Sequence, residues 1–387
     1  MAQTGGTGQT GGAGETPERD KRGKPSRFRT VGDGSGIAEG EGFYREEVAL
    51  GLRNHGMPLE GLCYPITPTG MHYVLVHFDI PEVTETEWRL EVGGLVDRPL
   101  KLTLEDVRKR PAVTMPVTME CAGNGRALME PRPVSQPWHT EAIGTAEWTG
   151  TPLKGLLEEA GVRSEVDEVL FTGLDRGVQG DIVQEYQRSL SVEDASRDEV
   201  VLVYAMNGRP LEPQHGFPLR LVVPGWYGMT SVKWLCRIEA IRGPFEGYQM
   251  LGSYRYTQSM DDVGEPVTLQ RVRALMAPPG IPDFFTRTRL VEAGPVRLSG
   301  RAWAGRLAVA GVEVSTDGCA TWEEAELGKP VGQFAWCEWS YDWEATPGTH
   351  MLCVRARDSA GNVQPDTVWN YQGMGNNMVQ RVEVVVE

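Results

Sequence analysis

Cys121 stands where a strand-like run meets a glycine-rich turn. The stretch VTMECAGNGR, residues 117–126, ends an alternating run at this cysteine and continues with Gly123, Gly125 and Arg126. A thiol at such a corner can be a nucleophile, which needs a histidine base and backbone N–H groups for an oxyanion. It can also be a soft thiolate ligand of a transition metal, beside a backbone that a large cofactor can approach. A third interpretation is a buried cysteine before a tight turn, with no chemical role.

Cationic and polar side chains gather in two other turn-rich stretches. QHGFPLRLVVPGWYGMTSVKWL contains His215, and its alternation places Arg220 and Lys233 opposite the apolar side chains. A guanidinium binds phosphate through a planar fork and an ammonium binds it as a point charge, so this set suits a bulky anion that carries phosphate. The stretch GLRNHGMPL adds a second group, Arg53, Asn54 and His55.

Helical and strand patterns are interleaved irregularly over residues 42–285, which favours an α+β domain. TPLKGLLEEAGV predicts a helix that Thr151 caps and that ends at Gly161, and VVLVYAMNGRPL predicts a strand that turns at Asn207. MHYVLVHFDIP alternates like a strand. Its two histidines, at positions 72 and 77, would then point to opposite faces and would not form a metal pair.

The two ends of the chain differ from this central region. Residues 1–41 are rich in glycine and nearly free of apolar side chains, so we expect a disordered tail. Residues 286–387 contain short alternating segments separated by turn residues, which is typical of an immunoglobulin-like β-sandwich. In the last segment, Val382, Val384 and Val386 should share one buried face.

Composition excludes several classes of protein. A formal net charge of -15 argues against a nucleic-acid partner, because such partners require concentrated Lys and Arg. The chain has no apolar run long enough for a membrane span and no recognisable export signal, so we expect a cytoplasmic protein, or a periplasmic one if a signal has been removed. The six cysteines form no C-x-x-C pair, which excludes a zinc knuckle and a c-type haem site. We interpret most of them as small buried apolar residues.

Seven motifs occur in a fixed order between residue 42 and the C-terminus: RNH, ECAGNGR, AIGTAEWTGTPL, GLDRG, MNGRPL, HGFPLRLVVPGWYG and VKWL. In these motifs the chain resembles the sulfite oxidase family of molybdenum enzymes, of the bacterial sulfite dehydrogenase and sulfane dehydrogenase type. The resemblance implies a mixed molybdopterin domain followed by an immunoglobulin-like dimerisation domain, and therefore a homodimer. It implies a molybdenum–molybdopterin cofactor. The chain departs from the family in having no haem b5 module and no C-x-x-C-H motif, so we expect no haem or flavin in this chain and a separate electron acceptor.

The resemblance also assigns roles to residues around the cofactor. Cys121 would be the thiolate that binds molybdenum. Cations would neutralise the pterin phosphate, while polar side chains would hydrogen-bond its ring system. The positions that match the family's pterin-binding residues are Asn54, His55, Asp175, His215, Arg220, Ser231, Val232 and Lys233.

A second set of matched positions would surround the substrate. Arg53 and Arg126 match two arginines that attract an oxyanion, and Trp138 matches a tryptophan that lines the pocket. Tyr256 is the choice for the family's active-site tyrosine, with Tyr254 as the alternative.

One departure from the family concerns Gln372. It stands in WNYQGMGNN, where eukaryotic oxidases carry a substrate-binding arginine in a WNxRG segment. The loss of a fixed cation would weaken the attraction for a dianion or make room for a larger, less charged substrate. Gln372 is therefore included among the candidate substrate residues.

The function that the resemblance implies is oxidation of sulfite to sulfate by oxygen-atom transfer. Electrons would leave to an external acceptor such as a soluble cytochrome c. Because LRNHGMPLEGL and ITPTGMHYVLVHFDIP also resemble the catalytic subunit of sulfane dehydrogenase, oxidation of protein-bound sulfane sulfur is the alternative. Nitrate reductase is less favoured, since those enzymes carry fused haem and flavin modules. Outside this class, a cofactor-free binding protein built on the sandwich domain is the other possibility.

Overall fold

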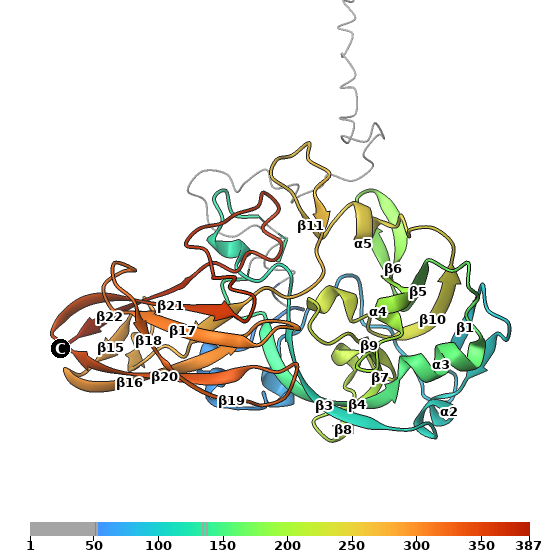
Figure 1. Ribbon diagram of the computed structural model, residues 1–387, viewed down its shortest axis with the longest axis horizontal. Coiled ribbons are helices and arrows are strands. Elements are labelled where there is room, and N and C mark those ends of the chain that lie inside the picture. The colour runs from blue at the N-terminus through green and yellow to red at the C-terminus, as the bar shows by residue number, and fades with distance from the viewer. Residues whose placement is uncertain (1–50, 52, 134, 137) are drawn as a thin grey trace, which may run out of the picture.

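The computed structural model describes residues 51, 53–133, 135–136 and 138–387, so the tail expected over residues 1–41 lies outside the described residues. Two β-rich parts lie side by side, and helices α2 to α5 belong to the first of them (Figure 1). The fold is therefore the expected α+β domain followed by an immunoglobulin-like β-sandwich.

One sheet of the first part has the strand order β2-β1-β10-β5-β6. Neighbouring strands are antiparallel except β1 and β10, which are parallel. Both β5 pairings shift register near Asp175, and such irregularities re-aim side chains. The strands are β1 (Leu90–Gly94), β2 (Leu100–Leu102), β5 (Glu168–Gln179), β6 (Ile182–Ser191) and β10 (Leu235–Ile241).

A second sheet has the order β3-β4-β7-β8, and β9 pairs with β7. Its strands are β3 (Val113–Glu120), β4 (Ile143–Pro152), β7 (Val201–Met206), β8 (Arg209–Pro210) and β9 (Arg220–Val222). The helices of this part are α2 (Leu104–Arg108), α3 (Leu153–Ala160), α4 (Val192–Ala195) and α5 (Tyr248–Leu251). The largest apolar core takes side chains from both sheets and from α3.

Local sequence signals give the right elements at two places. Helix α3 ends at Gly161, which adopts the left-handed conformation, although its N-cap is Pro152 rather than Thr151. Strand β7 turns into β8 at Asn207 and Gly208, both of which have positive φ. Side chains that are close in sequence decide both features.

The strand expected over MHYVLVHFDIP does not form. In this stretch the backbone makes only an isolated bridge, between Val74 and His55. Without the regular two-residue period, His72 and His77 are not forced to opposite faces, and both line the same pocket. The alternation of apolar residues therefore wrongly predicted a strand in this stretch.

The C-terminal part is a sandwich of two sheets, with orders β13-β16-β20-β19 and β14-β15-β22-β21-β17-β18. Val384 and Val386 are buried in its core and Val382 packs against it, as expected. The first of these sheets includes β13, which pairs with β16. Its strands are β13 (Arg273–Met276), β14 (Ile281–Pro282), β15 (Arg289–Val291), β16 (Gly294–Trp303), β17 (Val309–Ser315), β18 (Glu323–Glu324), β19 (Glu326–Pro330), β20 (Cys337–Ala345), β21 (Gly348–Asp358) and β22 (Gln380–Val386).

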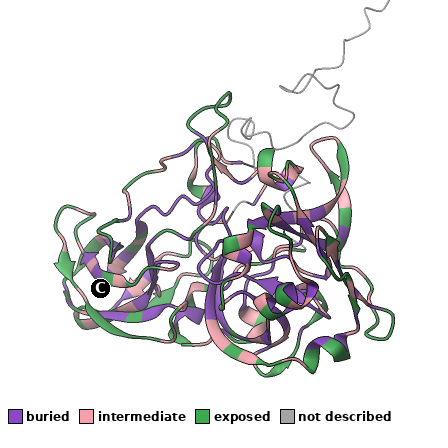
Figure 2. Cartoon of the chain, turned by 45° about the vertical axis from the view of Figure 1, so that its right-hand side comes forward, coloured by how far each residue is buried: buried purple, intermediate pink, exposed green. Residues whose placement is uncertain are grey.

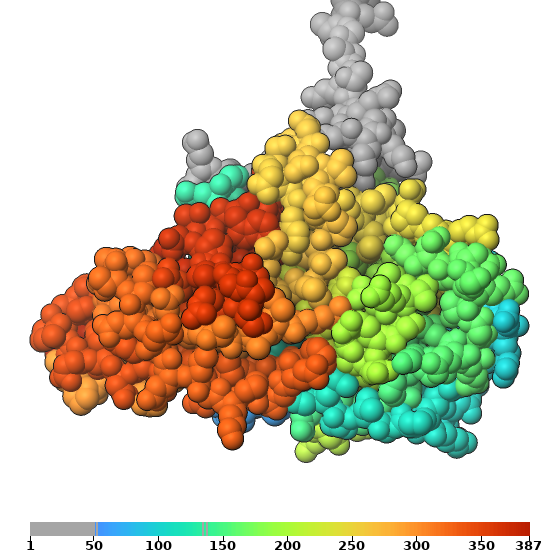
Figure 3. Space-filling model, viewed as in Figure 1, coloured from blue at the N-terminus to red at the C-terminus, as the bar shows by residue number. Residues whose placement is uncertain are grey.

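The two parts are in broad contact. A two-stranded ribbon of β11 (Arg255–Tyr256) and β12 (Glu265–Pro266) belongs to the segment that links them, yellow in Figure 3. Trp303 and Trp336 of the sandwich share an apolar cluster with Met57, Leu62 and Ile143 of the first part. Buried residues run continuously through the inner strands of both parts (Figure 2). The sandwich can therefore support the end of β3, where Cys121 lies.

Candidate active site

Cys121 follows directly after β3, and its N–H still donates to the carbonyl of Ala142, at 2.9 Å. The side chain is 3% exposed, and the N–H of Gly123 donates to its sulfur at 3.4 Å. Burial raises the pKa of the thiol to about 11, while the Gly123 N–H and Trp138 act in the opposite direction. A thiol with this pKa is protonated at neutral pH, so it does not behave as an activated nucleophile. A bound metal would favour the thiolate.

Two glycines follow Cys121 in this corner. A Cβ on Gly123 would lie 2.5 Å from the side-chain oxygen of Gln136, and Gly125 has φ of +99°. The backbone conformation at Gly125 thus favours glycine, and a side chain at Gly123 would have to displace that of Gln136.

A pocket opens beside Cys121. Its wall combines side chains from β3, the bulge in β5, and the segments around β9 and β10. The lining residues are His72, Tyr73, Val74, Leu75, His77, Met119, Cys121, Asp175, Tyr186, Gln214, His215, Arg220, Gly228, Met229, Ser231, Lys233, Trp234 and Tyr254. Six of the sequence-predicted positions are therefore brought together: Cys121, Asp175, His215, Arg220, Ser231 and Lys233.

Two cations in the pocket bind backbone carbonyls. Arg220 donates to the carbonyls of His215 (3.0 Å) and Ser231 (3.1 Å), and Lys233 Nζ donates to those of Leu75 (2.7 Å) and Gln214 (3.0 Å). Burial lowers the pKa of Arg220 to about 10 and that of Lys233 to about 7. An anion bound here would restore the charged form of Lys233.

Several buried polar atoms at the pocket have no hydrogen-bond partner among the described residues. They include Asp175 Oδ1, Arg220 Nε and His72 Nε2. Burial raises the pKa of Asp175 to about 7. Buried polar atoms are normally paired, so these atoms indicate a site for a polar ligand.

The pocket contains three buried histidines, His72, His77 and His215. Burial lowers their pKa values to about 4, 3 and 2, and nearby cations add to the effect at His77 and His215. They are therefore neutral at pH 7 and can both donate and accept hydrogen bonds.

Of the two candidate tyrosines, Tyr254 lines the pocket and Tyr256 does not. The Tyr254 hydroxyl lies 2.5 Å from His77 Nε2 and accepts from Gln136 Nε2 at 3.0 Å. Tyr254 also has φ of +59°, an uncommon conformation for a bulky residue. The Tyr256 ring instead packs against Trp369 at a tilt of 42°, with 4.9 Å between the ring centroids. The first choice made from the sequence is therefore corrected by the position of the side chains.

The motif RNH does not reach the pocket. The Arg53 guanidinium is exposed and donates to the carbonyl of Phe78, and Asn54 accepts from the N–H of Val76 at 2.6 Å. His55 is exposed and pairs through its backbone with Val74. These three residues support the pocket-lining segment from behind. The resemblance of this motif to the family's therefore did not predict where these three residues lie.

The remaining predicted residues lie around Cys121 without lining the pocket. Trp138 packs beside the Cys121 cluster. Arg126 is 7% exposed; its Nε donates to the carbonyl of Gln372 at 3.0 Å and its Nη1 donates to that of Ser135. The side-chain oxygen of Gln372 accepts from the backbone N–H of Arg255 at 3.4 Å.

Val232 contributes no side chain to the pocket. It is fully buried in the main apolar core, between Ser231 and Lys233, which do line the pocket.

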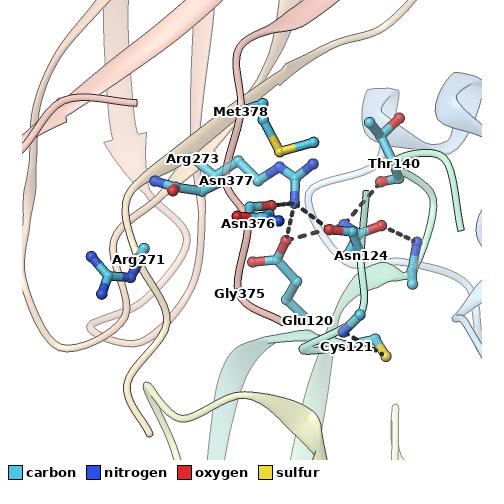
Figure 4. Close-up of polar contacts among 12 residues, drawn as sticks. Glu120, Cys121, Asn124, Thr140, Arg271, Arg273, Gly375, Asn376, Asn377 and Met378 are labelled. Atoms are coloured by element: carbon cyan, nitrogen blue, oxygen red, sulfur yellow. Dashed lines mark hydrogen bonds and ion pairs between the residues drawn. The ribbon is translucent and has the colours of Figure 1, made fainter. Parts of the chain in front are cut away.

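A buried ion pair anchors the Cys121 corner to the sandwich (Figure 4). Arg273 of β13 contacts Glu120, the residue before Cys121, at 2.7 Å, and both side chains are 1% exposed. Glu120 also accepts from Asn124 Nδ2 (3.0 Å) and Trp303 Nε1 (2.9 Å). Every donor comes from the Cys121 loop or the sandwich, so the sandwich helps to fix the loop.

Four residues near the site escaped the sequence interpretation: His77, Gln136, Arg188 and Arg273. Arg188 is 1% exposed, donates to the carbonyl of Gln249, and lies 5.8 Å from the centre of the Tyr254 ring. The sequence did contain a signal for Arg188, because this residue alternates with Tyr186 and Leu190 on a buried face of β6. A charged residue on such a face needs a special reason.

Among the described residues, no helix is long and apolar enough to cross a membrane. The same residues contain no cluster of three or more His, Cys, Asp or Glu side chains that could hold a metal ion. If a metal binds at Cys121, most of its ligands must come from outside the protein.

Two family models match the chain. The model described as "Oxidoreductase molybdopterin binding domain" matches residues 77–249, and "Mo-co oxidoreductase dimerisation domain" matches residues 282–387. The first begins at His77, beyond the RNH motif at residues 53–55.

Curated relatives include plant nitrate reductases. The enzyme of Hordeum vulgare is 35% identical over 83% of this chain and 39% of its own length, and one from Solanum lycopersicum is 33% identical over 89% and 40%. The chain thus spans about two fifths of the length of these relatives.

Among solved structures, the sulfane dehydrogenase SoxCD from Paracoccus pantotrophus is similar with a TM-score of 0.75. It is 26% identical, and the match covers 91% of this chain and 90% of that one.

Proposed function

Because the chain belongs to the molybdopterin-binding oxidoreductases and carries their dimerisation domain, we propose that it oxidises reduced sulfur, with carrier-bound sulfane sulfur as its substrate. The similarity to SoxCD, which extends over nearly the whole of both chains, supports this substrate class.

The residues at the pocket fit a molybdopterin cofactor. Cys121 offers a sulfur ligand at the end of β3, and soft thiolates suit transition metals. Arg220 and Lys233 offer buried cations for a phosphate. Asp175 Oδ1 and His72 Nε2, which have no protein partner among the described residues, would gain one from a polar ring system.

When bound, the cofactor supplies oxygen-atom transfer and two-electron redox chemistry. The chain's own residues bind and orient the reactants. Tyr254, whose hydroxyl contacts His77 and Gln136, lines the same pocket as Cys121. Burial and the nearby Cys121 raise the pKa of Tyr254, so it stays protonated and acts as a hydrogen-bond donor.

The arrangement of arginines carries the choice of sulfane over sulfite. Sulfite carries one or two negative charges near neutral pH and needs cations at the pocket beyond those that would bind the cofactor's phosphate. Neither Arg53 nor Arg126 lines the pocket: Arg53 donates to the carbonyl of Phe78, and Arg126 donates to the carbonyls of Ser135 and Gln372. Arg188 does not line the pocket either: it donates to the carbonyl of Gln249, and its Nε has no partner among the described residues. This site is better suited to a sulfur atom delivered on an uncharged arm than to a free anion.

Nitrate reduction is the second candidate, favoured by the 35% identity to a plant nitrate reductase. For either function we propose a homodimer, on the basis of the dimerisation domain, and a separate electron carrier such as a cytochrome c.

Single-turnover spectroscopy tests the proposal. The full chain, purified with molybdenum, is mixed in its oxidised state with a protein-bound persulfide or with sulfite, and in its reduced state with nitrate. We expect the persulfide to bleach the oxidised spectrum faster than sulfite does, and nitrate to leave the reduced spectrum unchanged. Faster bleaching by sulfite would refute the sulfane assignment. Reoxidation by nitrate would establish the second candidate.

A further inference from the structure

Two cysteines far from the pocket come together in the sandwich. Cys319 Sγ lies 2.6 Å from Cys353 Sγ. Cys353 belongs to β21 and is fully buried, whereas Cys319 is partly exposed in the turn that follows β17. Their approach depends on chain segments that are 34 positions apart in sequence.

The register of the strands fixes the position of Cys353. Within the β17–β21 pair, Cys353 lies opposite Ser315, the last residue of β17. The chain must then turn back over Cys353 for Cys319 to reach it.

A hydrogen-bonded turn makes this return. The Cys319 N–H donates to Ser315 Oγ at 2.9 Å, and the Gly318 N–H donates to the carbonyl of Met351 on β21 at 3.0 Å. Asp317 accepts from the N–H groups of Ala320 (3.0 Å) and Thr321 (2.9 Å). The turn is therefore fixed at both ends before any sulfur chemistry occurs.

Backbone conformation adds a second argument. Cys319 has φ of +76°, in the left-handed region where glycine is favoured, and it directly follows Gly318 with φ of +75°. A cysteine at such a position meets a conformational cost that glycine would avoid. Contact with Cys353 gives a reason for a cysteine, rather than a glycine, at position 319.

From this geometry we propose that Cys319 and Cys353 form a disulfide when the protein meets an oxidant of the small-molecule disulfide class. The partly exposed Cys319 thiolate attacks one sulfur of the oxidant, forming a mixed disulfide and releasing one small thiol. Cys353 then attacks Cys319 Sγ and displaces the second small thiol. Two S–H bonds are lost and one S–S bond forms, while the oxidant gains two electrons and two protons.

The crosslink would join the turn after β17 to β21 and enclose β18, β19 and β20 in its loop. Closing a loop of this length restricts the unfolded chain, so the oxidised protein should melt about 5 °C higher than the reduced protein.

Peptide mapping tests the proposal on the full chain. The folded protein is equilibrated with oxidised glutathione, its free thiols are alkylated under denaturing conditions, and it is cleaved after glutamate, which separates Cys337 from Cys353 at Glu338. We expect one crosslinked pair of peptides, containing Cys319 and Cys353, that disappears after reduction.

Two variants complete the experiment. Cys319→Ser changes the surface turn, so it should fold, lose the crosslinked peptides and lose the rise in melting temperature. Cys63→Ser, which removes an exposed cysteine elsewhere, should keep the crosslinked peptides and the rise in melting temperature. Recovery of alkylated Cys319 and Cys353 from the oxidised, folded protein would overturn the proposal, as would a melting temperature that oxidation raises equally in Cys319→Ser.

Discussion

The ion pair between Arg273 and Glu120 gives a quantitative prediction about the junction of the two parts. Both side chains are 1% exposed and 2.7 Å apart. Replacing Arg273 with Met leaves the Glu120 carboxylate buried, with only the neutral donors of Asn124 and Trp303. Breaking such a pair from one side costs about 3–5 kcal/mol, so we expect a loss of about 4 kcal/mol in the free energy of unfolding.

A second substitution tests whether the loss comes from the unpaired charge. In Arg273→Met with Glu120→Gln, the buried group is neutral. Its single amide oxygen can accept from Asn124 or from Trp303 but not from both, because these two donors bond to different oxygens of Glu120. The double variant should therefore be more stable than Arg273→Met alone, by about 2 kcal/mol, because a neutral amide is less costly to bury than a carboxylate.

Urea denaturation followed by tryptophan fluorescence measures these differences, since Trp303 itself donates to Glu120. Lys101→Met serves as the matched control, because Lys101 pairs with Glu91 on the exposed surface and should leave the urea midpoint nearly unchanged. A loss below about 1 kcal/mol in Arg273→Met, with an unchanged slope, would refute the view that a charged Glu120 depends on Arg273.

The same variant should affect the Cys121 corner. Cys121 follows Glu120 directly, and Asn124 in the same loop donates to Glu120 and accepts from Arg273 through its carbonyl. In cofactor-free protein, loosening of this loop should speed alkylation of the buried Cys121 thiol by roughly tenfold or more. An unchanged alkylation rate would mean that the sandwich does not hold the loop.

Three other predictions concern the pocket. Cys121→Ser should abolish turnover but retain pterin, measured as released pterin fluorescence, because serine is a harder ligand and the pocket cations remain; normal turnover would refute the ligand assignment. Gln372→Arg should not lower the Michaelis constant for sulfite, because this side chain faces the Arg255 N–H; a lower constant at an unchanged melting temperature would contradict that orientation. Burial lowers the pKa of His72 to about 4, so between pH 6.5 and 4 the unfolded chain binds a proton that the folded state does not, and acid destabilises the fold. In cofactor-free protein, His72→Gln should reduce the acid-induced loss in the free energy of unfolding by roughly 1 kcal/mol per pH unit, measured by urea titrations. His139→Gln, at an exposed histidine, is the control and should not reduce that loss.

How far the site could be predicted is clearest from Arg220 and His55. The alternation in PLRLVV placed Arg220 opposite Leu219 and Leu221, and in the structure it lines the pocket while both leucines enter the core. Strand periodicity is local, so the sequence carries it directly. The motif around His55 predicted that this histidine would lie at the cofactor. In the structure, His55 pairs with Val74 of the stretch MHYVLVHFDIP, and it is His77 of that stretch that lines the pocket.

Short stretches of sequence were enough to predict four local features: the cysteine after β3, the glycines that turn the chain behind it, the end of α3 at Gly161 and the turn at Asn207. These features depend on residues within a few positions of one another.

Contacts between groups that are distant in sequence depend instead on the packing of the whole fold. Arg273 reaches Glu120 across 153 positions, and Tyr254, rather than Tyr256, lines the pocket with Cys121. Cys319 contacts Cys353 because the register of β17 and β21 and a hydrogen-bonded turn bring them together. Such contacts follow from the packing of whole sheets, which no short pattern encodes, because each contact is a balance of burial and pairing over many residues.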